Sequence, residues 1–303
     1  MGKKIVVLGS LNMDVVVSAD RAPLPGETIH GKHVLYLPGG KGANKAVGIK
    51  KLGGKVQMVG AVGNDMFGNQ ITEQLKRYNL DTNYISTVST VPTGIANIVH
   101  LPNDNSIIVI PGANGECTPN QLQSLEQLVE QADILLMQLE IPLETVAFAL
   151  KIAKKNQVET ILNPAPATQL SDELLELVDY ITPNETELEV LVGSKVSFDK
   201  KNLEKVFEKW HDKHQTKLIV TLGEKGCAYW CEDQLMIVPA YKVNQVVDTT
   251  GAGDAFNAAL AYGLSQDWPI ANIVAFAVTG SALAVTKFGA QEGMPTKQEV
   301  EEA

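Results

Sequence analysis

Cysteine is scarce in this chain of 303 residues, which contains only Cys117, Cys227 and Cys231. A disulfide framework uses more cysteines and an even number of them, so these three predict free thiols in a cytoplasmic protein. Cys227 and Cys231 could contribute half of a metal site, but no second pair and no nearby histidine completes one. The cysteine content therefore favours neither a disulfide-rich secreted domain nor a structural zinc site.

A surplus of basic residues is also missing. The chain has 25 Lys and Arg against 35 Asp and Glu, which gives a net charge of −10. A protein that binds the phosphate backbone of nucleic acid usually shows the opposite balance, so nucleic acid is not an expected partner. The apolar run near the N-terminus is short and leads into Gly9-Ser10, and no run is long enough to span a membrane. We therefore expect no membrane partner.

The common phosphate-binding signatures are incomplete or absent. Residues 26–32, GETIHGK, match the spacing of a P-loop, but His33 follows where that loop has Ser or Thr. No G-x-G-x-x-G follows the first expected strand. An acidic chain that binds an anionic substrate must then do so locally, with backbone amides, a lysine or a metal ion.

What the chain does contain is a repeated alternation of strand and helix patterns. It begins with the β-branched run KKIVVLGS at residues 3–10, which predicts a buried strand. Such alternation is typical of an α/β fold with a mostly parallel central sheet and helices on both faces. We expect one domain over residues 1–303. A helix is predicted over 118–132, with Thr118 as its N-cap.

Two stretches, at about 13–37 and 91–111, interrupt the alternation with additional strands. We expect strands at 13–19 and 27–37, and a hairpin over 93–112 whose turn lies at 102–105. These strands could form a small separate sheet that acts as a lid.

The stretch VVDTTGAGDAF at 246–256 places Gly-Ala-Gly where an expected strand runs into an expected helix. Backbone amides at a helix N-terminus lack partners and favour an anion, and small residues allow its close approach. Asp254 falls in the first helical turn. From this stretch alone two interpretations remain: Asp254 only complements the helix dipole, or it is a base beside a bound hydroxyl group.

A second glycine-rich stretch, LPGGKGANKA at 37–46, lies at another junction of loop and helix. It could be a flexible loop before a helix, or a site where amides, Lys41 and Asn44 bind a polyhydroxy ligand. Ligands of open α/β sheets bind beyond the carboxyl ends of the strands. Polar residues follow the expected strands at Asn12, Asp14, Glu140, Asn184 and Glu187. Together these residues favour a binding site.

At this point the motifs resemble a known family. GGKGAN at 39–44, NETE at 184–187 and DTTGAGDAF at 248–256 resemble the signatures of the ribokinase (PfkB-type) carbohydrate kinases, in the expected order. GSLNMD at 9–14 is similar to the ribokinases of that family in particular. The resemblance covers nearly the whole chain. It implies ATP-dependent phosphorylation of D-ribose at O5, and a homodimer formed through the lid.

The resemblance also implies roles for single residues. Asp254 would be the base that accepts the proton of the attacking hydroxyl, and the amides of Gly251, Ala252 and Gly253 would stabilise charge on the phosphoryl group. The implied sugar-binding residues are Asn12, Met13, Asp14, Gly40, Lys41, Gly42, Ala43, Asn44, Glu140 and Asp254.

ATP, Mg²⁺ and K⁺ are the implied cofactors. Glu187 would position Mg²⁺ through water. The implied nucleotide-binding residues are Asn184, Glu187, Thr221, Leu222, Gly223, Glu224, Lys225, Gly226, Gly253 and Asp254. The implied K⁺ ligands, several of them backbone carbonyls, are Asp248, Thr250, Ala284, Lys287, Gly289 and Gly293. A serine often occupies the position of Gly293 in the family, so glycine here removes one side-chain oxygen.

Two rival functions remain. One is a kinase for deoxyribose, fructose or adenosine, although adenosine would favour an aromatic platform, and the chain has only seven Phe, seven Tyr and three Trp. The other is a non-catalytic sugar-binding protein on the same fold. That function predicts a lost base or a broken anion site, whereas Asp254 and the Gly-Ala-Gly tripeptide are both intact.

Overall fold

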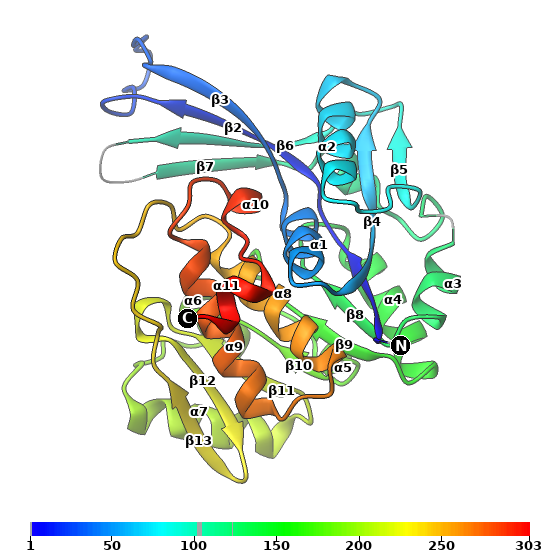
Figure 1. The fold of residues 1–303 in the computed structure, drawn as a ribbon, viewed down its shortest axis with the longest axis vertical. Coiled ribbons are helices and arrows are strands. Elements are labelled where there is room, and N and C mark those ends of the chain that lie inside the picture. Colours follow the sequence, from blue (N-terminus) through cyan, green and yellow to red (C-terminus); the bar gives the residue numbers. More distant parts are fainter. Residues whose placement is uncertain (1, 102–104, 123) are drawn as a thin grey trace.

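The computed structural model describes residues 2–101, 105–122 and 124–303. Across these residues a large nine-stranded sheet forms the centre of the molecule (Figure 1). Neighbouring strands are parallel except at the pairs β11–β12 and β12–β13. In spatial order the strands are β13 (Gln234–Val238), β12 (Cys227–Cys231), β11 (Lys217–Thr221), β10 (Tyr180–Ile181), β9 (Glu159–Leu162), β8 (Ile134–Met137), β1 (Lys4–Leu8), β4 (Lys55–Gly63) and β5 (Ile85–Val88). The predicted α/β class with a mostly parallel sheet is confirmed.

Helices cover both faces of this sheet. In β1, Ile5 and Val7 belong to one hydrophobic cluster and Val6 and Leu8 to the other, as the alternation of side chains along a strand requires. The first cluster includes residues of α1 (Lys41–Lys51), α2 (Met66–Arg77), α8 (Ala252–Ser265) and α9 (Ile270–Ala284). The second includes residues of α3 (Leu125–Glu130), α4 (Leu143–Lys155), α5 (Asp172–Leu175), α6 (Glu185–Val192) and α7 (Lys200–Lys213). Shorter helical segments are η1 (Gly112–Glu116), η2 (Gly223–Lys225), α10 (Ala290–Gly293) and α11 (Lys297–Glu301).

A second, four-stranded sheet confirms the predicted lid. Its order is β3 (His33–Gly39), β2 (Asn12–Ser18), β6 (Gly94–His100) and β7 (Asn105–Ile110). The pairs β2–β3 and β6–β7 are antiparallel, and β2–β6 is parallel. Figure 1 shows this sheet reaching away from the large sheet, above α10. The expected hairpin is therefore present, while residues 102–104 of its expected turn lie outside the described residues.

Two predicted boundaries are wrong. The strand expected at 27–37 begins only at His33 and continues to Gly39. Residues before it form a turn, in which the Glu27 amide donates to the Leu24 carbonyl and the Glu27 carboxylate pairs with Arg21.

The helix expected over 118–132 is the second correction. Thr118 begins only a short turn, and α3 starts at Leu125 after Ser124, whose φ of 68° is left-handed. A left-handed residue cannot continue a right-handed helix, so the pattern over 118–132 contains a break that residue types do not reveal. Gln123 of this stretch lies outside the described residues.

No helix within the described ranges has both the length and the apolar character needed to cross a membrane.

The start of α1 is fixed by close backbone packing. Gly40 has φ 93° and ψ 134°, and a Cβ built there would lie 2.6 Å from the Asn12 amide nitrogen and 2.7 Å from the Ser10 carbonyl oxygen. The Ala43 amide donates to the same Ser10 carbonyl at 3.0 Å. The first turn of α1 is thereby held against the chain that leaves β1.

Gly40→Ala is expected to destabilise the fold. The unfavourable φ costs about 1–3 kcal/mol, and the forced contact adds about 1–3 kcal/mol. Gly53→Ala is the matched control, since Gly53 has φ 89° but a Cβ there would meet nothing within 4 Å. Urea unfolding should show a clearly larger loss for Gly40→Ala, and equal losses would contradict the packing argument.

Candidate active site

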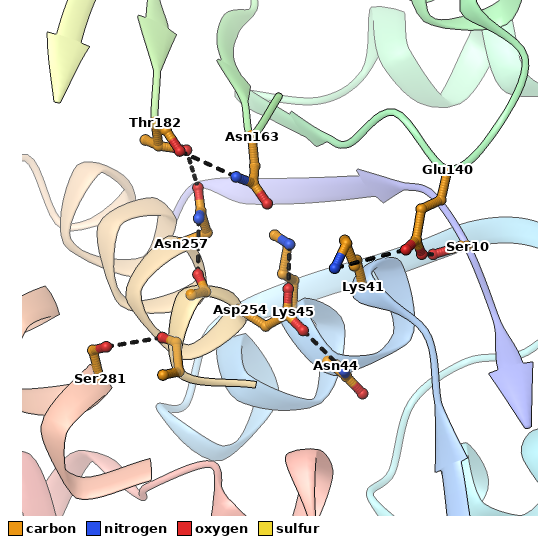
Figure 2. A network of polar contacts seen from close by, with 12 residues as sticks. Ser10, Lys41, Asn44, Lys45, Glu140, Asn163, Thr182, Asp254, Asn257 and Ser281 are labelled. Carbon is orange, nitrogen blue, oxygen red and sulfur yellow. Dashed lines mark hydrogen bonds and ion pairs between the residues drawn. The ribbon is translucent and has the colours of Figure 1, made fainter. Parts of the chain in front are cut away.

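Asp254 lies in the first turn of α8, facing the first turns of α1 (Figure 2). Asn44 Nδ2 donates to Asp254 Oδ2 at 2.9 Å, and Lys45 Nζ donates to Oδ1. Burial by itself raises the pKa of this carboxyl, but the charges of Lys45 and Lys41 and the two hydrogen bonds lower it overall. Asp254 is therefore an ionised carboxylate inside the protein, which can accept a hydrogen bond or a proton.

The backbone just before Asp254 is a tight turn, in which the Ala252 amide donates to the Thr249 carbonyl at 3.3 Å. Gly251 caps α8 with a left-handed φ of 84°. Gly253 differs, since it is exposed, has no positive φ, and a Cβ there would meet nothing within 4 Å. A helical glycine costs about 1 kcal/mol relative to alanine, so the fold does not explain Gly253. The open space at Gly253 leaves room for a ligand to approach the backbone closely.

Several side chains hold this first turn of α8 in place, and sequence reasoning did not identify them. Asn257 Nδ2 donates to the Gly253 carbonyl at 2.8 Å, and Thr182 Oγ1 donates to Asn257 Oδ1 at 2.7 Å. Ser281 of α9 donates to the Ala252 carbonyl at 2.9 Å (Figure 2). A polar Asn257 within the apolar stretch AFNAAL was the available signal.

Lys41 and Glu140 meet at one side of the site. Lys41 Nζ lies 3.6 Å from Glu140 Oε1, and Ser10 Oγ donates to Glu140 Oε2 at 2.5 Å (Figure 2). Burial lowers the pKa of Lys41, but the carboxylates of Asp254 and Glu140 outweigh it and raise the pKa overall. Lys41 is thus a firmly protonated, partly accessible donor.

The lid contributes Asn12 and Asp14 from β2. Asn114 Nδ2, which sequence reasoning missed, donates to Asn12 Oδ1 at 2.7 Å. Burial, with the charges of Glu140 and Asp254, raises the pKa of Asp14 to about 7. The side chain of Met13 between them is fully buried in the hydrophobic core, so it does not face the site.

A cavity of about 590 Å³ lies between the lid and the loops around residues 246–250 and 288–290. That volume is in the range of small-molecule sites. Its lining includes Asp14, Leu37, Pro38, Asp248, Thr250 and Gly289.

A second group of predicted residues lies at the start of α6. Asn184 and Glu187 form a capping box, in which each side chain accepts a hydrogen bond from the other residue's amide. The Thr221 amide donates to the Pro183 carbonyl, and Lys225 Nζ lies 3.8 Å from Glu185 Oε1. The loop 221–226 is therefore adjacent to the capping box. Leu222, by contrast, points into the core, as does Ala43 of α1.

Asp248 joins two of the other predicted cation ligands, Thr250 and Gly289. Its Oδ1 and Oδ2 accept from the amides of Thr250 and Gly289, each at 2.9 Å. Lys287 pairs with Glu299, so only its carbonyl is available to a cation. A Cβ at Gly293 would lie 2.6 Å from the Ala284 carbonyl oxygen, which shows how closely these two residues pack. Among the described residues no group of three or more His, Cys, Asp or Glu side chains could hold a metal ion.

Comparisons with known proteins agree with this geometry. The chain matches the family model described as pfkB family carbohydrate kinase over residues 2–297. It is 42% identical over 300 residues to the ribokinase of Lactococcus lactis subsp. lactis, covering 98% of this chain and 95% of that protein. It is 36% identical over 301 residues to the deoxyribokinase of Salmonella typhi, covering 98% and 97%. A solved structure of Arabidopsis thaliana ribokinase complexed with ribose and ATP matches with a TM-score of 0.92 at 34% identity, covering 100% and 98%. The chain therefore belongs to the pfkB family of carbohydrate kinases.

Proposed function

We propose that this protein transfers the γ-phosphoryl group of ATP to O5 of D-ribose, giving ribose 5-phosphate and ADP. The observation that carries the proposal is the carboxylate of Asp254, bound by Asn44 and Lys45, beside the exposed residue Gly253 at the start of α8. A base for a hydroxyl and an anion site for a phosphoryl group are thus adjacent. The ribokinase of Lactococcus lactis, at 42% identity, supports ribose as the sugar.

Asp254 accepts the proton of the attacking hydroxyl as the oxygen bonds to phosphorus. A carboxylate is a weak base, but it suffices because the proton leaves late in phosphoryl transfer, where positioning and charge stabilisation dominate. The amides of residues 251–253 stabilise the negative charge that develops on the transferred group. The hydrogen bond from Ser281 to the Ala252 carbonyl fixes the peptide group that carries the Gly253 amide, and the bond from Asn257 to the Gly253 carbonyl fixes the next peptide group.

The sugar is bound between the lid and the end of β8. Lys41 and Asn44 donate hydrogen bonds to hydroxyl oxygens, while Asp14 and Glu140 accept from hydroxyl groups. The lid excludes water, which otherwise competes with the sugar as phosphoryl acceptor.

The nucleotide lies beside the capping box at the start of α6. The capping box uses only the Oδ1 atom of Asn184, so Nδ2 of that side chain is available to donate to the phosphates. Glu187 uses Oε2 for the cap and leaves Oε1 to hold Mg²⁺ through water. The loop 221–226 contacts the rest of the nucleotide. Mg²⁺ neutralises charge on the phosphates when it is bound.

K⁺ fits the oxygens around Asp248. Each carboxylate oxygen keeps acceptor capacity after one amide bond, and the carbonyls of Thr250, Ala284, Lys287 and Gly289 add further hard oxygens. Gly293 contributes its carbonyl, since it has no side-chain oxygen. When bound, the cation adds positive charge beside the anion site.

We place the reaction in the cytosol, where ATP is supplied and thiols remain reduced. Free thiols at Cys117, Cys227 and Cys231 support this location.

A panel of sugars tests the proposed substrate. ADP formation with ribose should exceed that with deoxyribose, fructose or adenosine in kcat/KM, and ribose no better than these would refute the assignment. The deoxyribokinase of Salmonella typhi makes deoxyribose the sharpest competitor.

Asp254→Asn should lower turnover about 10²–10⁴-fold and keep ribose binding. Retained turnover would show that Asp254 is not the base.

Gly253→Ala distinguishes the role of Gly253 in anion binding from any role in the stability of the fold. Alanine should raise helix stability by up to about 1 kcal/mol, while kcat falls about 10²-fold because the methyl group occupies the phosphoryl position. Steady-state kinetics and thermal unfolding measure the two effects. Unchanged kcat would show that no ligand approaches this amide.

We also propose a homodimer formed through the lid. Both edge strands of the lid sheet expose apolar side chains, and edge strands of this kind pair with other chains. On β3 these are Val34, Leu35 and Tyr36, and on β7 they are Ile107, Ile108, Val109 and Ile110.

Sedimentation velocity at micromolar concentration should give a dimer. Ile108→Lys should shift it to a monomer, since a charge cannot be buried unpaired in an apolar interface. Met236→Lys on β13, outside the lid, is the control that should remain dimeric. A monomeric wild type would contradict this assembly.

A further inference from the structure

Lys45 is a lysine with no solvent-accessible surface. Lysine is almost never fully buried unless it is paired, because its charge loses hydration. It follows Asn44 in the first turn and a half of α1, and none of the functional motifs assigns it a role. The cost of burying the Lys45 ammonium group must therefore be offset by an interaction inside the protein.

Its partner is the carboxylate of Asp254. Lys45 Nζ donates to Oδ1 while Asn44 Nδ2 donates to Oδ2, so two successive residues of α1 hold both oxygens (Figure 2). Each oxygen has two lone pairs, so each can still accept from a sugar hydroxyl. The orientation of the carboxylate is thereby fixed before any substrate arrives.

Lys45 cannot itself contact the sugar or the nucleotide, because its side chain is completely enclosed. Lys41, one turn earlier, has a side chain that is 35% exposed and can reach a ligand. The two lysines at the start of α1 therefore have different roles: Lys41 faces the ligand, and Lys45 faces the base.

Burial lowers the pKa of Lys45 overall, and the adjacent carboxylate of Asp254 is the main group that opposes this effect. The charge of Lys45 also balances an acidic surrounding. Three carboxylates lie close enough to interact with the Asp254–Lys45 pair or with Lys41: those of Glu140, Asp14 and Glu187. An approaching triphosphate adds more negative charge. Burial and these acids favour the protonated form of Asp254. Lys45 and Lys41 oppose that effect, and the result is a lowered pKa for Asp254.

We propose that Lys45 is a positioning residue for the phosphoryl transfer: it fixes the carboxylate of Asp254 and keeps it ionised when the anionic nucleotide binds. The proposal rests on the proposed role of Asp254 as base.

The test compares Lys45→Gln and Lys45→Met with the wild type. Glutamine keeps a hydrogen-bond donor and removes the charge, whereas methionine removes both. Asp14 faces the same sugar and has a pKa of about 7, so every profile is recorded in an Asp14→Asn background that removes its titration. In that background, loss of the charge at residue 45 raises the pKa of Asp254, so the acid limb of kcat/KM for ribose should move to higher pH by about 1 unit or more in both variants. At the plateau, kcat should fall about 10-fold or more in Lys45→Met and less in Lys45→Gln. The KM for ATP should change little.

Lys50→Met on the same helix is the matched control, and its pH profile should coincide with that of the wild type. Circular dichroism establishes that each variant is folded, and Lys45→Gln carries the test where Lys45→Met does not fold. Acid limbs that coincide with the wild type in a folded Lys45 variant would overturn the proposal.

Calorimetric titration of ribose across the same pH range gives a readout that needs no turnover. Ribose affinity should weaken modestly, and at a higher pH in the Lys45 variants than in the wild type, because a protonated Asp254 accepts a hydroxyl hydrogen bond more weakly than the ionised carboxylate does. Absence of wild-type turnover would count against the proposed function, whereas wild-type turnover with coinciding limbs would count against Lys45 alone.

Discussion

The contact of Asp254 with Asn44 and Lys45 joins the beginnings of α1 and α8, which are more than 200 residues apart in the chain. The first turns of both helices carry the charged side chains of the site, Lys41 and Lys45 on α1 and Asp254 on α8. Without Asn44 and Lys45 in this packing, Asp254 would be a buried carboxylate without partners, which is costly. The stability of this region and the geometry of the site therefore depend on the same contact.

The sheet explains why these groups converge. Parallel strands place their carboxyl ends at one edge, and the side chains that follow β1, β8 and β10 meet there with the two helix N-termini. The second sheet adds Asp14 to the cavity beneath the lid, and both walls of that cavity mix polar residues such as Asp248 and Thr250 with apolar residues such as Leu37 and Phe288. Such a mixed lining can bind both the hydroxyl groups and the carbon skeleton of a sugar.

Sequence patterns predicted the sheet, the lid and the acidic and glycine-rich motifs, because alternating periodicity and helix-junction glycines are local signals. The break before α3 was not predictable, since it depends on the left-handed backbone of Ser124. Asn114, Asn257 and Ser281 were also missed, because each acts through one hydrogen bond to a distant segment. Lys45 was missed for the same reason: its burial arises only when α1 packs beside α8.

The most direct test of the account is a crystal structure of the protein with ribose and a non-hydrolysable ATP analogue. The account predicts ribose O5 within hydrogen-bond distance of the Asp254 carboxylate, the γ-phosphoryl group against the Gly253 amide, and Lys45 still bound to Asp254 Oδ1. A sugar bound away from Asp254, or a terminal phosphate that does not reach the start of α8, would contradict it.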